Sequence, residues 1–345
     1  MSAIPTAADD LTAERLTDIL RSADHDAEVT SVSAEPVGTG QMAGSYRIRL
    51  TYAEASPTLP DTMIAKMATG PQDQRDFACG AFRNEVGFYQ DLASTFRVPV
   101  PRHFGSVISP TGAEFVLLLE DMADARQGDQ IAGCTPAQAE SVAIAAAVLH
   151  GPRWNDADLI DRFPLPTDDD RALMESVLEP MAQVYRDRFA PVGIDDGAVE
   201  WLVAQAGDWL VTPQRSVALV HGDLRIDNVL FGADDTVTII DWQTIVSGNP
   251  LRDIAFLLST SLTVDDRRAH ERRIVAAYHD ALLSHGVSGY SPEECWDDYV
   301  ANLIQGPLIV VFGSAAAQPT PRGDTMFETM LHRSATAIDD LVASR

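Results

Sequence analysis

Lysine is almost absent from this 345-residue sequence. Of its 25 basic residues, 24 are arginine and only Lys66 is lysine. Basic residues of both kinds are outnumbered, because 51 acidic residues bring the formal net charge to −26. A nucleic-acid binder needs a basic face that releases counterions from phosphates. The charge balance therefore argues against a nucleic-acid partner and is typical of a soluble cytosolic protein.

Cysteines and long apolar runs are scarce as well. The three cysteines, Cys79, Cys134 and Cys295, show neither metal-ligand spacing nor a disulfide framework, which favours a reducing compartment. The first ten residues lack the basic and then apolar pattern of a signal peptide. The longest apolar stretches fall short of a membrane span. We therefore expect a cytoplasmic protein without a membrane partner, and no feature of the sequence specifies an oligomeric state.

The character of the sequence changes near residue 120. Before this point, strand patterns surround a single helix pattern, with strands expected at 29–52, 61–67 and 115–119 and the helix at 75–92. Beyond it, helix patterns dominate, at 136–149, 168–189, 196–210 and from 252 onwards. We therefore predict an α+β protein with two lobes, a small β-rich lobe of residues 1–119 and a larger α-helical lobe of residues 120–345.

A polar loop in the second lobe lies between two short apolar strands predicted at 217–220 and 237–240. It reads HGDLRIDNVLF, and Asn228 follows Asp223 by five residues, as in a kinase catalytic loop. Asp241 follows at the end of the second strand, where a carboxylate can chelate Mg²⁺ between phosphates. A capped turn explains Asp223 alone but not the three residues at these intervals. We predict Asp223 as the catalytic base and Asn228 and Asp241 as metal ligands.

The first lobe contains the one lysine at a position that favours phosphate binding. Lys66 stands near the end of the strand predicted at 61–67, where its ammonium group can reach α- and β-phosphates. Glu85 follows 19 residues later on the predicted helix and can form the ion pair that positions this lysine. A solvated surface glutamate is the alternative interpretation of Glu85.

Two further segments are candidates for nucleotide contacts. A glycine-rich turn contains Gly38, Gly40, Gly44 and Ser45, whose backbone N–H groups suit phosphates, although an ordinary hairpin explains the turn equally well. The connector FVLLLEDM offers the backbone of Glu120 and Met122 to an adenine edge, and an ordinary connecting strand explains it equally well.

These motifs resemble the aminoglycoside phosphotransferase and choline kinase-like family, which has a protein-kinase-like fold. HGDLRIDNVLF is similar to its catalytic loop and IIDWQ to its metal-binding strand, whereas the glycine turn departs from the family pattern. LLLEDM and Gln243 most closely resemble the ecdysteroid kinase-like branch. The resemblance implies a bilobal protein-kinase-like fold and the cofactors ATP and Mg²⁺. It also implies that Arg225 steadies the γ-phosphate and that Asp253 is structural.

The acceptor is expected to be a small-molecule alcohol. Asp253 follows Asp241 by only 12 positions, without the anchor motif that closes the peptide-docking segment of protein kinases. Apolar residues such as Trp296 and Tyr299 hint at a lipophilic alcohol, although they are more often core residues. The acidic run Asp168–Asp170 hints at an aminoglycoside, although a helix N-terminus explains it better. Both acceptors stay open, as does a non-catalytic nucleotide-binding protein on this fold.

Overall fold

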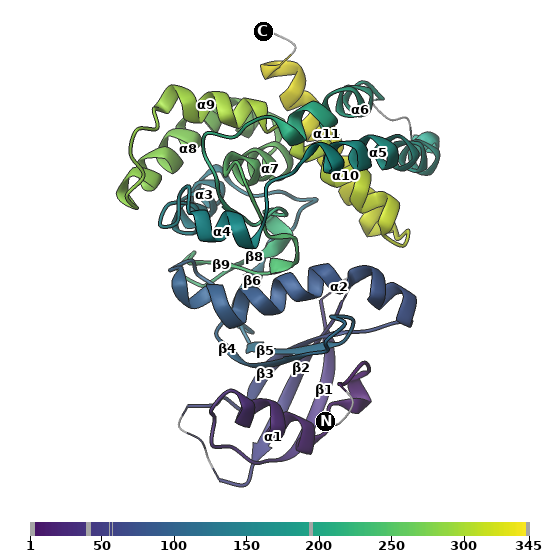
Figure 1. Ribbon diagram of the computed structural model, residues 1–345, viewed down its shortest axis with the longest axis vertical. Helices are drawn as coiled ribbons and strands as arrows, with labels where there is room; N and C mark the ends of the chain where they lie inside the picture. The colour runs from purple at the N-terminus through teal and green to yellow at the C-terminus, as the bar shows by residue number, and fades with distance from the viewer. Residues whose placement is uncertain (1–3, 39–42, 55, 57, 193–195, 343–345) are drawn as a thin grey trace. The chain divides into compact units, whose positions relative to one another are not determined.

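The chain divides into two compact units in the computed structural model (Figure 1). The structure describes residues 4–38, 43–54, 56, 58–192 and 196–342. The first unit comprises Met1–Ala125 together with Thr238–Thr244, and the second comprises Arg126–Val237 and Ile245–Arg345. The first unit therefore ends six residues beyond the lobe boundary predicted at 119. Residues 238–244 belong to the first unit, although the residues before and after them belong to the second. A prediction with one boundary near residue 119 could not include this segment in the first lobe.

The first unit is built on a five-stranded antiparallel sheet with the strand order β1-β2-β3-β5-β4. Its strands are β1 (Val29–Val37), β2 (Ala43–Tyr52), β3 (Thr62–Ala68), β4 (His103–Ile108) and β5 (Phe115–Glu120). Strand β5 is buried from Phe115 to Leu119, as its unbroken apolar sequence predicts. Strand β4 was not anticipated, because its sequence HFGSVI has no clear alternation of apolar and polar residues.

Two helices cover opposite faces of this sheet (Figure 1). The helix α1 (Ala13–Ser22) buries Leu16, Ile19 and Leu20 in one core cluster with Met63 and Met67 of β3. The helix α2 (Gln72–Gly87) packs on the other face, where the ring centroids of Phe82 and Phe115 lie 4.8 Å apart. It continues as a π-helical turn, η2 (Phe88–Leu92), within the helix predicted at 75–92. Short 3₁₀ turns complete the unit at η1 (Ala8–Asp10), η3 (Ala93–Thr95) and η6 (Trp242–Thr244).

The second unit is mainly helical, which together with the sheet of the first unit confirms the predicted α+β class. Its helices are α3 (Pro136–His150), α4 (Ala157–Arg162), α5 (Asp168–Phe189), α6 (Asp196–Val211), α7 (Leu251–Ser261), α8 (Val264–Ser284), α9 (Pro292–Ala301), α10 (Gln305–Ala316) and α11 (Pro321–Leu341). Short strands and 3₁₀ turns connect them: β6 (Arg126–Gln127), β7 (Ala218–Val220), β8 (Val229–Phe231), β10 (Val246–Gly248), η4 (Ala190–Val192) and η5 (Ile226–Asn228). The strand β9 (Val237–Ile239) starts at the last residue of the segment Arg126–Val237 of the second unit and continues into the first unit.

The helix α7 forms the centre of the second unit and is buried along almost its whole length. Among the residues that the structure describes, one stretch, Pro292–Ala316, is long and apolar enough to cross a membrane. It consists of α9 and α10 with a turn between them, and 67% of its most apolar window is buried inside the protein. Core helices show the same combination of length, apolar composition and burial.

Candidate functional site

Lys66 is held between two carboxylates of the first unit. Its Nζ lies 2.7 Å from Glu85 Oε1 and 2.9 Å from Asp241 Oδ1. Burial alone would lower the pKa of Lys66, but the charges of Asp241 and Glu85 raise it above its ordinary value. The ion pair that the sequence suggested for Glu85 is therefore present, and Asp241 joins it from a segment 175 residues away along the chain. The phosphate-binding role of Lys66 stays a prediction.

The carboxylate of Glu85 is fixed on both of its oxygens. Lys66 occupies Oε1, and Gln243 donates its Nε2 to Oε2 at 3.1 Å. Gln243 is itself anchored, because Asn84 Nδ2 donates to its main-chain oxygen at 3.2 Å. The sequence did not predict that Gln243 positions Glu85. The one signal for such a role was that Gln243 directly follows the IDW motif.

The segment that carries Asp241 has a strained backbone next to a firmly packed ring. Asp241 has a φ of 69°, in the left-handed region that costs a non-glycine residue about 1–2 kcal/mol. The neighbouring Trp242 is fully buried and stacks on Phe88 with ring centroids 3.8 Å apart and an interplanar angle of 5°. Such strain persists only where the surroundings impose it, and it is concentrated at functional sites.

Three of the four residues predicted in the glycine-rich turn belong to the described residues. Gly40 lies outside the described residues. Gly38 has a φ of 74°, and a Cβ added to it would meet no atom within 4 Å. A glycine is therefore favoured at this position by the backbone conformation and not by lack of space. Gly44 and Ser45 lie in β2, opposite Met67 and Lys66 of β3. A Cβ added to Gly44 would meet side-chain atoms of its neighbours at 2.9 Å, so local packing already accounts for this glycine. Phosphate contacts by this turn stay a prediction.

The connector after β5 contains the two residues, Glu120 and Met122, whose backbone was predicted to meet an adenine ring. The N–H of Glu120 donates to the carbonyl of Arg102 at 2.8 Å, and the carbonyl of Met122 accepts from Ala125 at 2.9 Å. Within the described part of the chain, no hydrogen bond is found for the Met122 N–H. A nucleotide contact at Met122 therefore stays a prediction.

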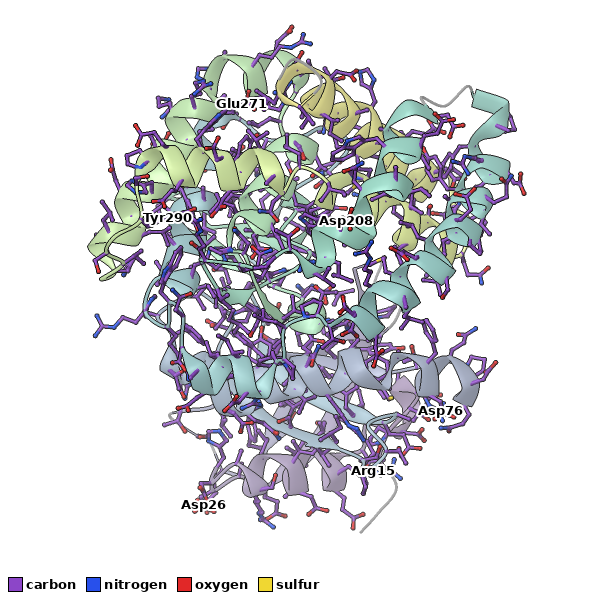
Figure 2. The ribbon with its side chains drawn as sticks, turned by 45° about the horizontal axis from the view of Figure 1, so that its top comes forward. Arg15, Asp26, Asp76, Asp208, Glu271 and Tyr290 are labelled. Carbon is purple, nitrogen blue, oxygen red and sulfur yellow. The ribbon has the colours of Figure 1, made fainter. Side chains whose placement is uncertain are left out.

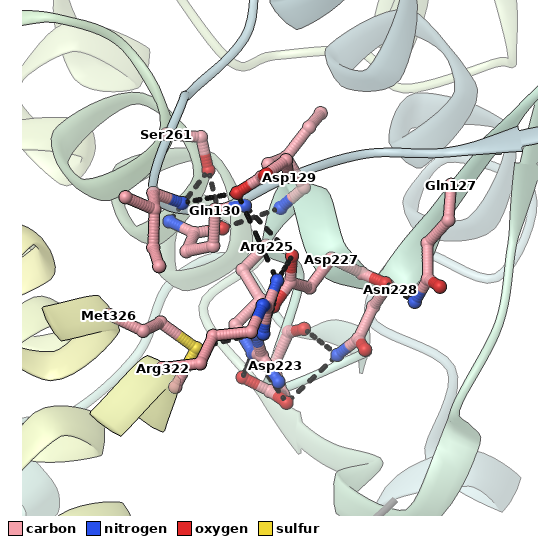
Figure 3. Close-up of polar contacts among 12 residues, drawn as sticks. Gln127, Asp129, Gln130, Asp223, Arg225, Asp227, Asn228, Ser261, Arg322 and Met326 are labelled. Carbon is pink, nitrogen blue, oxygen red and sulfur yellow. Dashed lines mark hydrogen bonds and ion pairs between the residues drawn. The ribbon is translucent and has the colours of Figure 1, made fainter. Parts of the chain in front are cut away.

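In the second unit, the catalytic-loop residues form one hydrogen-bonded cluster (Figure 3). The 3₁₀ turn η5 reverses the chain after Arg225, so that Asn228 returns to Asp223. Asn228 Nδ2 donates to the Oδ2 and to the main-chain oxygen of Asp223, at 2.9 Å in each case. Arg225 Nε lies 3.3 Å from Asp223 Oδ1. The loop thus fixes the carboxylate of Asp223 from two sides.

Asp227 anchors this loop, although the sequence did not single it out. Its Oδ1 accepts the backbone N–H of Gln130 at 2.8 Å, and its Oδ2 lies 2.9 Å from Arg225 Nη1. Arg322, at the start of α11, adds a contact of 3.2 Å from Nη2 to Oδ1 (Figure 3). Arg225 is therefore shared between Asp223 and Asp227, and a role on the γ-phosphate stays a prediction for it.

A second buried anchor holds the N-terminal side of the loop. Asp253 accepts the backbone N–H groups of His221 and Gly222 at 2.7 and 2.9 Å. His150 Nε2 lies 3.1 Å from Asp253 Oδ2, and its Nδ1 lies 2.7 Å from the hydroxyl of Tyr278. Burial would raise the pKa of Asp253, but the hydrogen bond and charge of His150 and the contacts from His221 lower it. This arrangement agrees with the structural role that the family resemblance implies for Asp253.

The two predicted metal ligands have donor atoms that suit Mg²⁺. Asp241 offers a carboxylate whose side chain is 38% exposed. Asn228 uses its amide nitrogen to hold Asp223, so the amide oxygen is the atom that would bind a metal ion. Hard oxygen donors of this kind are the ligands that Mg²⁺ prefers. Within the described ranges, no group of three or more histidine, cysteine, aspartate and glutamate side chains could hold a metal ion on its own.

Comparisons with known proteins bear on the family and the fold. The sequence profile of the Ecdysteroid kinase-like family matches residues 163–286, which include Asp223, Asn228 and Asp241. A 41-residue segment is 42% identical to chicken (Gallus gallus) Acyl-CoA dehydrogenase family member 11. This segment makes up 11% of this chain and 5% of that protein, so the chain matches only a small part of that relative.

Three solved structures are similar in fold. An ethanolamine kinase of Plasmodium vivax has a TM-score of 0.52 at 12% identity, over 94% of this chain and 87% of that one. Spectinomycin phosphotransferase in complex with ADP and spectinomycin has a TM-score of 0.53 at 12% identity, over 97% and 98%. The GDP complex of an aminoglycoside phosphotransferase has a TM-score of 0.51 at 14% identity, over 97% and 100%. At these identities the likeness shows a shared fold.

Proposed function

Since this chain has the protein-kinase-like fold of the aminoglycoside phosphotransferase and choline kinase-like group, and its ecdysteroid kinase-like segment contains the catalytic-loop motif, we propose that it is a small-molecule kinase. The substrate hydroxyl oxygen forms a bond to the γ-phosphorus of ATP. The bond from that phosphorus to the β–γ bridging oxygen breaks, ADP leaves, and Asp223 accepts the hydroxyl proton.

The observation that carries this proposal is the contact of Lys66 with both Glu85 and Asp241. The sequence has only one lysine, and its ammonium group lies 2.7 Å from one of these carboxylates and 2.9 Å from the other. A lysine–glutamate ion pair beside a metal-binding aspartate is the arrangement that orients the phosphates of a nucleotide in kinases. A surface lysine that only aids solubility would not be fixed by two carboxylates in this way.

The residues of the second unit support the proton-transfer step. Asn228 and Arg225 hold the carboxylate of Asp223, so its orientation is set before a substrate arrives. Asn228 and Asp241 would hold Mg²⁺, which when bound neutralises negative charge on the β- and γ-phosphates. Positioning and electrostatic stabilisation then supply most of the rate enhancement.

The acceptor class follows from the short chain segment after Asp241. Between Asp241 and Asp253 the chain forms only η6, β10 and the start of α7, which leaves no segment for docking a peptide. Of the two apolar residues that hinted at a lipophilic alcohol, Tyr299 is fully buried in the core. Trp296 is half-buried, and the guanidinium carbon of Arg272 lies 4.0 Å from its ring centroid. A small-molecule alcohol is therefore proposed, and aminoglycosides and lipophilic alcohols both belong in the test.

A phosphoryl-transfer screen tests the proposal. The full chain is incubated with Mg²⁺ and either labelled ATP or labelled GTP, against a panel of amino alcohols, aminoglycosides and sterols. We expect transfer to at least one alcohol, and we expect Asp223→Ala to abolish transfer while nucleotide binding persists. Nucleotide binding without transfer to any acceptor would instead favour the non-catalytic alternative. Unchanged transfer by Asp223→Ala would remove Asp223 from the mechanism.

We also propose a cytoplasmic location. All three cysteines are free thiols, and Cys134 and Cys295 are buried, as expected of a protein that folds without disulfides. Fractionation of cells that express the full chain, followed by blotting, would test this location. Recovery in a membrane or secreted fraction would contradict it.

A further inference from the structure

A cavity lies in the second unit, away from the loop 221–228. Its volume is about 630 Å³, within the range of small-molecule sites. The C-terminal half of α6, the segment before α9 and α9 itself form its walls, and Asp208 and Tyr290 mark two of them (Figure 2). No residue of the loop 221–228 lines this cavity.

A buried polar layer separates the cavity from that loop. Trp209 lines the cavity, and the guanidinium carbon of Arg252 lies 4.8 Å from its ring centroid. Arg252 Nε donates to Gln305 Oε1 at 3.2 Å, and Gln305 Nε2 donates to the carbonyl of Gly222 at 2.9 Å. Two side chains thus stand between the cavity wall and the residue before Asp223. The cavity is therefore a site of its own.

Two buried polar side chains in the cavity wall have donor groups without partners among the described residues. Ser216 and Asn249 are each only 3% exposed, yet both line the cavity. Asn249 Oδ1 accepts the N–H of Leu251, but in the described part of the chain no hydrogen bond is found for Asn249 Nδ2 or for Ser216 Oγ. Neither atom is sealed from solvent, so both donors are accessible from the cavity. They can therefore donate to an acceptor on a molecule that enters it.

The cavity is also rich in aromatic rings. Trp154, Trp201, Trp209 and Tyr290 line it, and the rings of Trp154 and Tyr290 pack with centroids 5.1 Å apart. Aromatic faces attract cations, and the contact of Arg252 with Trp209 already shows one such interaction in this wall.

Charge in the cavity favours a cationic occupant. Four carboxylates line the cavity against the single guanidinium of Arg215, and they belong to Asp208, Glu294, Asp297 and Asp298. These acids keep their charge although they have contacts: Asp208 lies 2.8 Å from Arg171, Asp298 accepts the hydroxyl of Tyr290 at 2.8 Å, and Glu294 accepts the N–H of Ser291 at 2.8 Å. Negative charge remains in excess even when Arg171 is counted.

We propose that this cavity binds a small organic cation, an ammonium compound with an apolar body and a hydrogen-bond acceptor. The ammonium group contacts the tryptophan faces and the carboxylates near α9. The acceptor faces Ser216 and Asn249. This site is additional to the proposed kinase site, and it requires neither ATP nor Asp223.

Acetylcholine is a suitable probe, because it has a quaternary ammonium group and an ester acceptor but no hydroxyl that a kinase could phosphorylate. Its neutral carbon analogue, 3,3-dimethylbutyl acetate, has the same shape without the charge. Binding of each to the full chain is measured by calorimetry in the absence of nucleotide. We expect saturable one-to-one binding of acetylcholine, and at least about fivefold weaker binding of the neutral ester.

Variants then assign the binding to this cavity. The pair Glu294→Gln with Asp297→Asn should weaken acetylcholine binding about fivefold, and Ser216→Ala should weaken it about threefold. The exposed Asp339→Asn, outside the cavity, should leave binding unchanged, as should Asp223→Ala. Absent binding, equal affinity for the neutral ester, or loss of binding in Asp223→Ala instead of the cavity variants would each overturn the proposal. Since no step depends on phosphoryl transfer, failure here leaves the proposed kinase activity intact.

Discussion

The amide of Asn228 holds the carboxylate of Asp223, with Nδ2 lying 2.9 Å from Oδ2. The same nitrogen donates to the main-chain oxygen of Asp223, so a single side chain fixes both the backbone and the carboxylate of the proposed base. The proposed roles of Asn228 are therefore separable, because its nitrogen positions Asp223 and its oxygen is the proposed metal ligand.

Replacing Asn228 by aspartate separates these two roles. Asn228→Asp keeps an oxygen for Mg²⁺ but loses the N–H donor and places a second negative charge beside Asp223. We expect kcat to fall by at least about tenfold while the Mg²⁺ requirement persists, as steady-state kinetics over a Mg²⁺ series would show. A kcat equal to that of the parent protein would show that the hydrogen bond is not needed.

The Lys66–Glu85 pair should behave as a coupled unit in unfolding experiments. Lys66→Met leaves the buried carboxylate of Glu85 without its ammonium partner, which we expect to cost about 3 kcal/mol of unfolding free energy. The double variant with Glu85→Gln should recover part of this loss in urea titrations, because it removes the uncompensated charge. Strictly additive effects of the two substitutions would contradict the coupling.

The same variant has a predictable pH dependence. Burial already raises the pKa of Glu85, and Lys66 opposes this effect. Without Lys66 the pKa of this carboxyl should rise further, so the folded state binds more protons than the unfolded state. Stability then falls as pH rises. The unfolding free energy that Lys66→Met loses relative to the parent should therefore be larger at pH 8 than at pH 6. An equal loss at both pH values would contradict the predicted rise in the pKa of Glu85.

Two substitutions of Asp241 separate backbone strain from metal binding. Asparagine tolerates the left-handed backbone at φ 69°, whereas alanine does not, so Asp241→Ala should be less stable than Asp241→Asn by about 1 kcal/mol. Both variants lose the carboxylate ligand, so we expect the Mg²⁺ concentration for half-maximal turnover to rise at least about tenfold. Thermal unfolding and kinetics over a Mg²⁺ series measure the two effects. Equal stability of the variants would remove the strain argument.

The loop anchor at Asp253 should contribute stability that depends on its charge. In Asp253→Asn one of the two backbone N–H groups would face an amide N–H, which we expect to cost about 2–3 kcal/mol at pH 7. The folded pKa of Asp253 is lowered, so its contribution is complete above the unfolded value of about 3.9 and is lost as pH falls through the folded value. Urea titrations should show the difference between parent and variant narrowing below about pH 4.

Local patterns in the sequence predicted the elements that carry the site. The helix predicted at 168–189 has these same bounds in α5, whose start is fixed by a capping box at Thr167. The change from strands to helices near residue 120 follows from periodicity alone. The family resemblance, which rests on the loop and IDWQ motifs, is confirmed by the family match and the fold.

Long-range contacts could not be predicted in the same way. The strand β10 pairs with β7 over only three residues, too few for a periodic signal. The hydrogen bond from Gln243 to Glu85 joins residues 158 positions apart, and the one from Gln130 to Asp227 joins residues 97 apart. The left-handed backbone of Asp241 could not be predicted either, because aspartate adopts that conformation only uncommonly, although more often than most non-glycine residues.

The most direct test of the central claim is the rate of phosphoryl transfer by Asp223→Asn. This variant keeps the size of the side chain but removes the base. With an acceptor identified by the screen, we predict that kcat falls by at least about 100-fold while the dissociation constant for ATP changes little. Transfer by Asp223→Asn at the rate of the parent protein would contradict the assignment of Asp223 as the catalytic base.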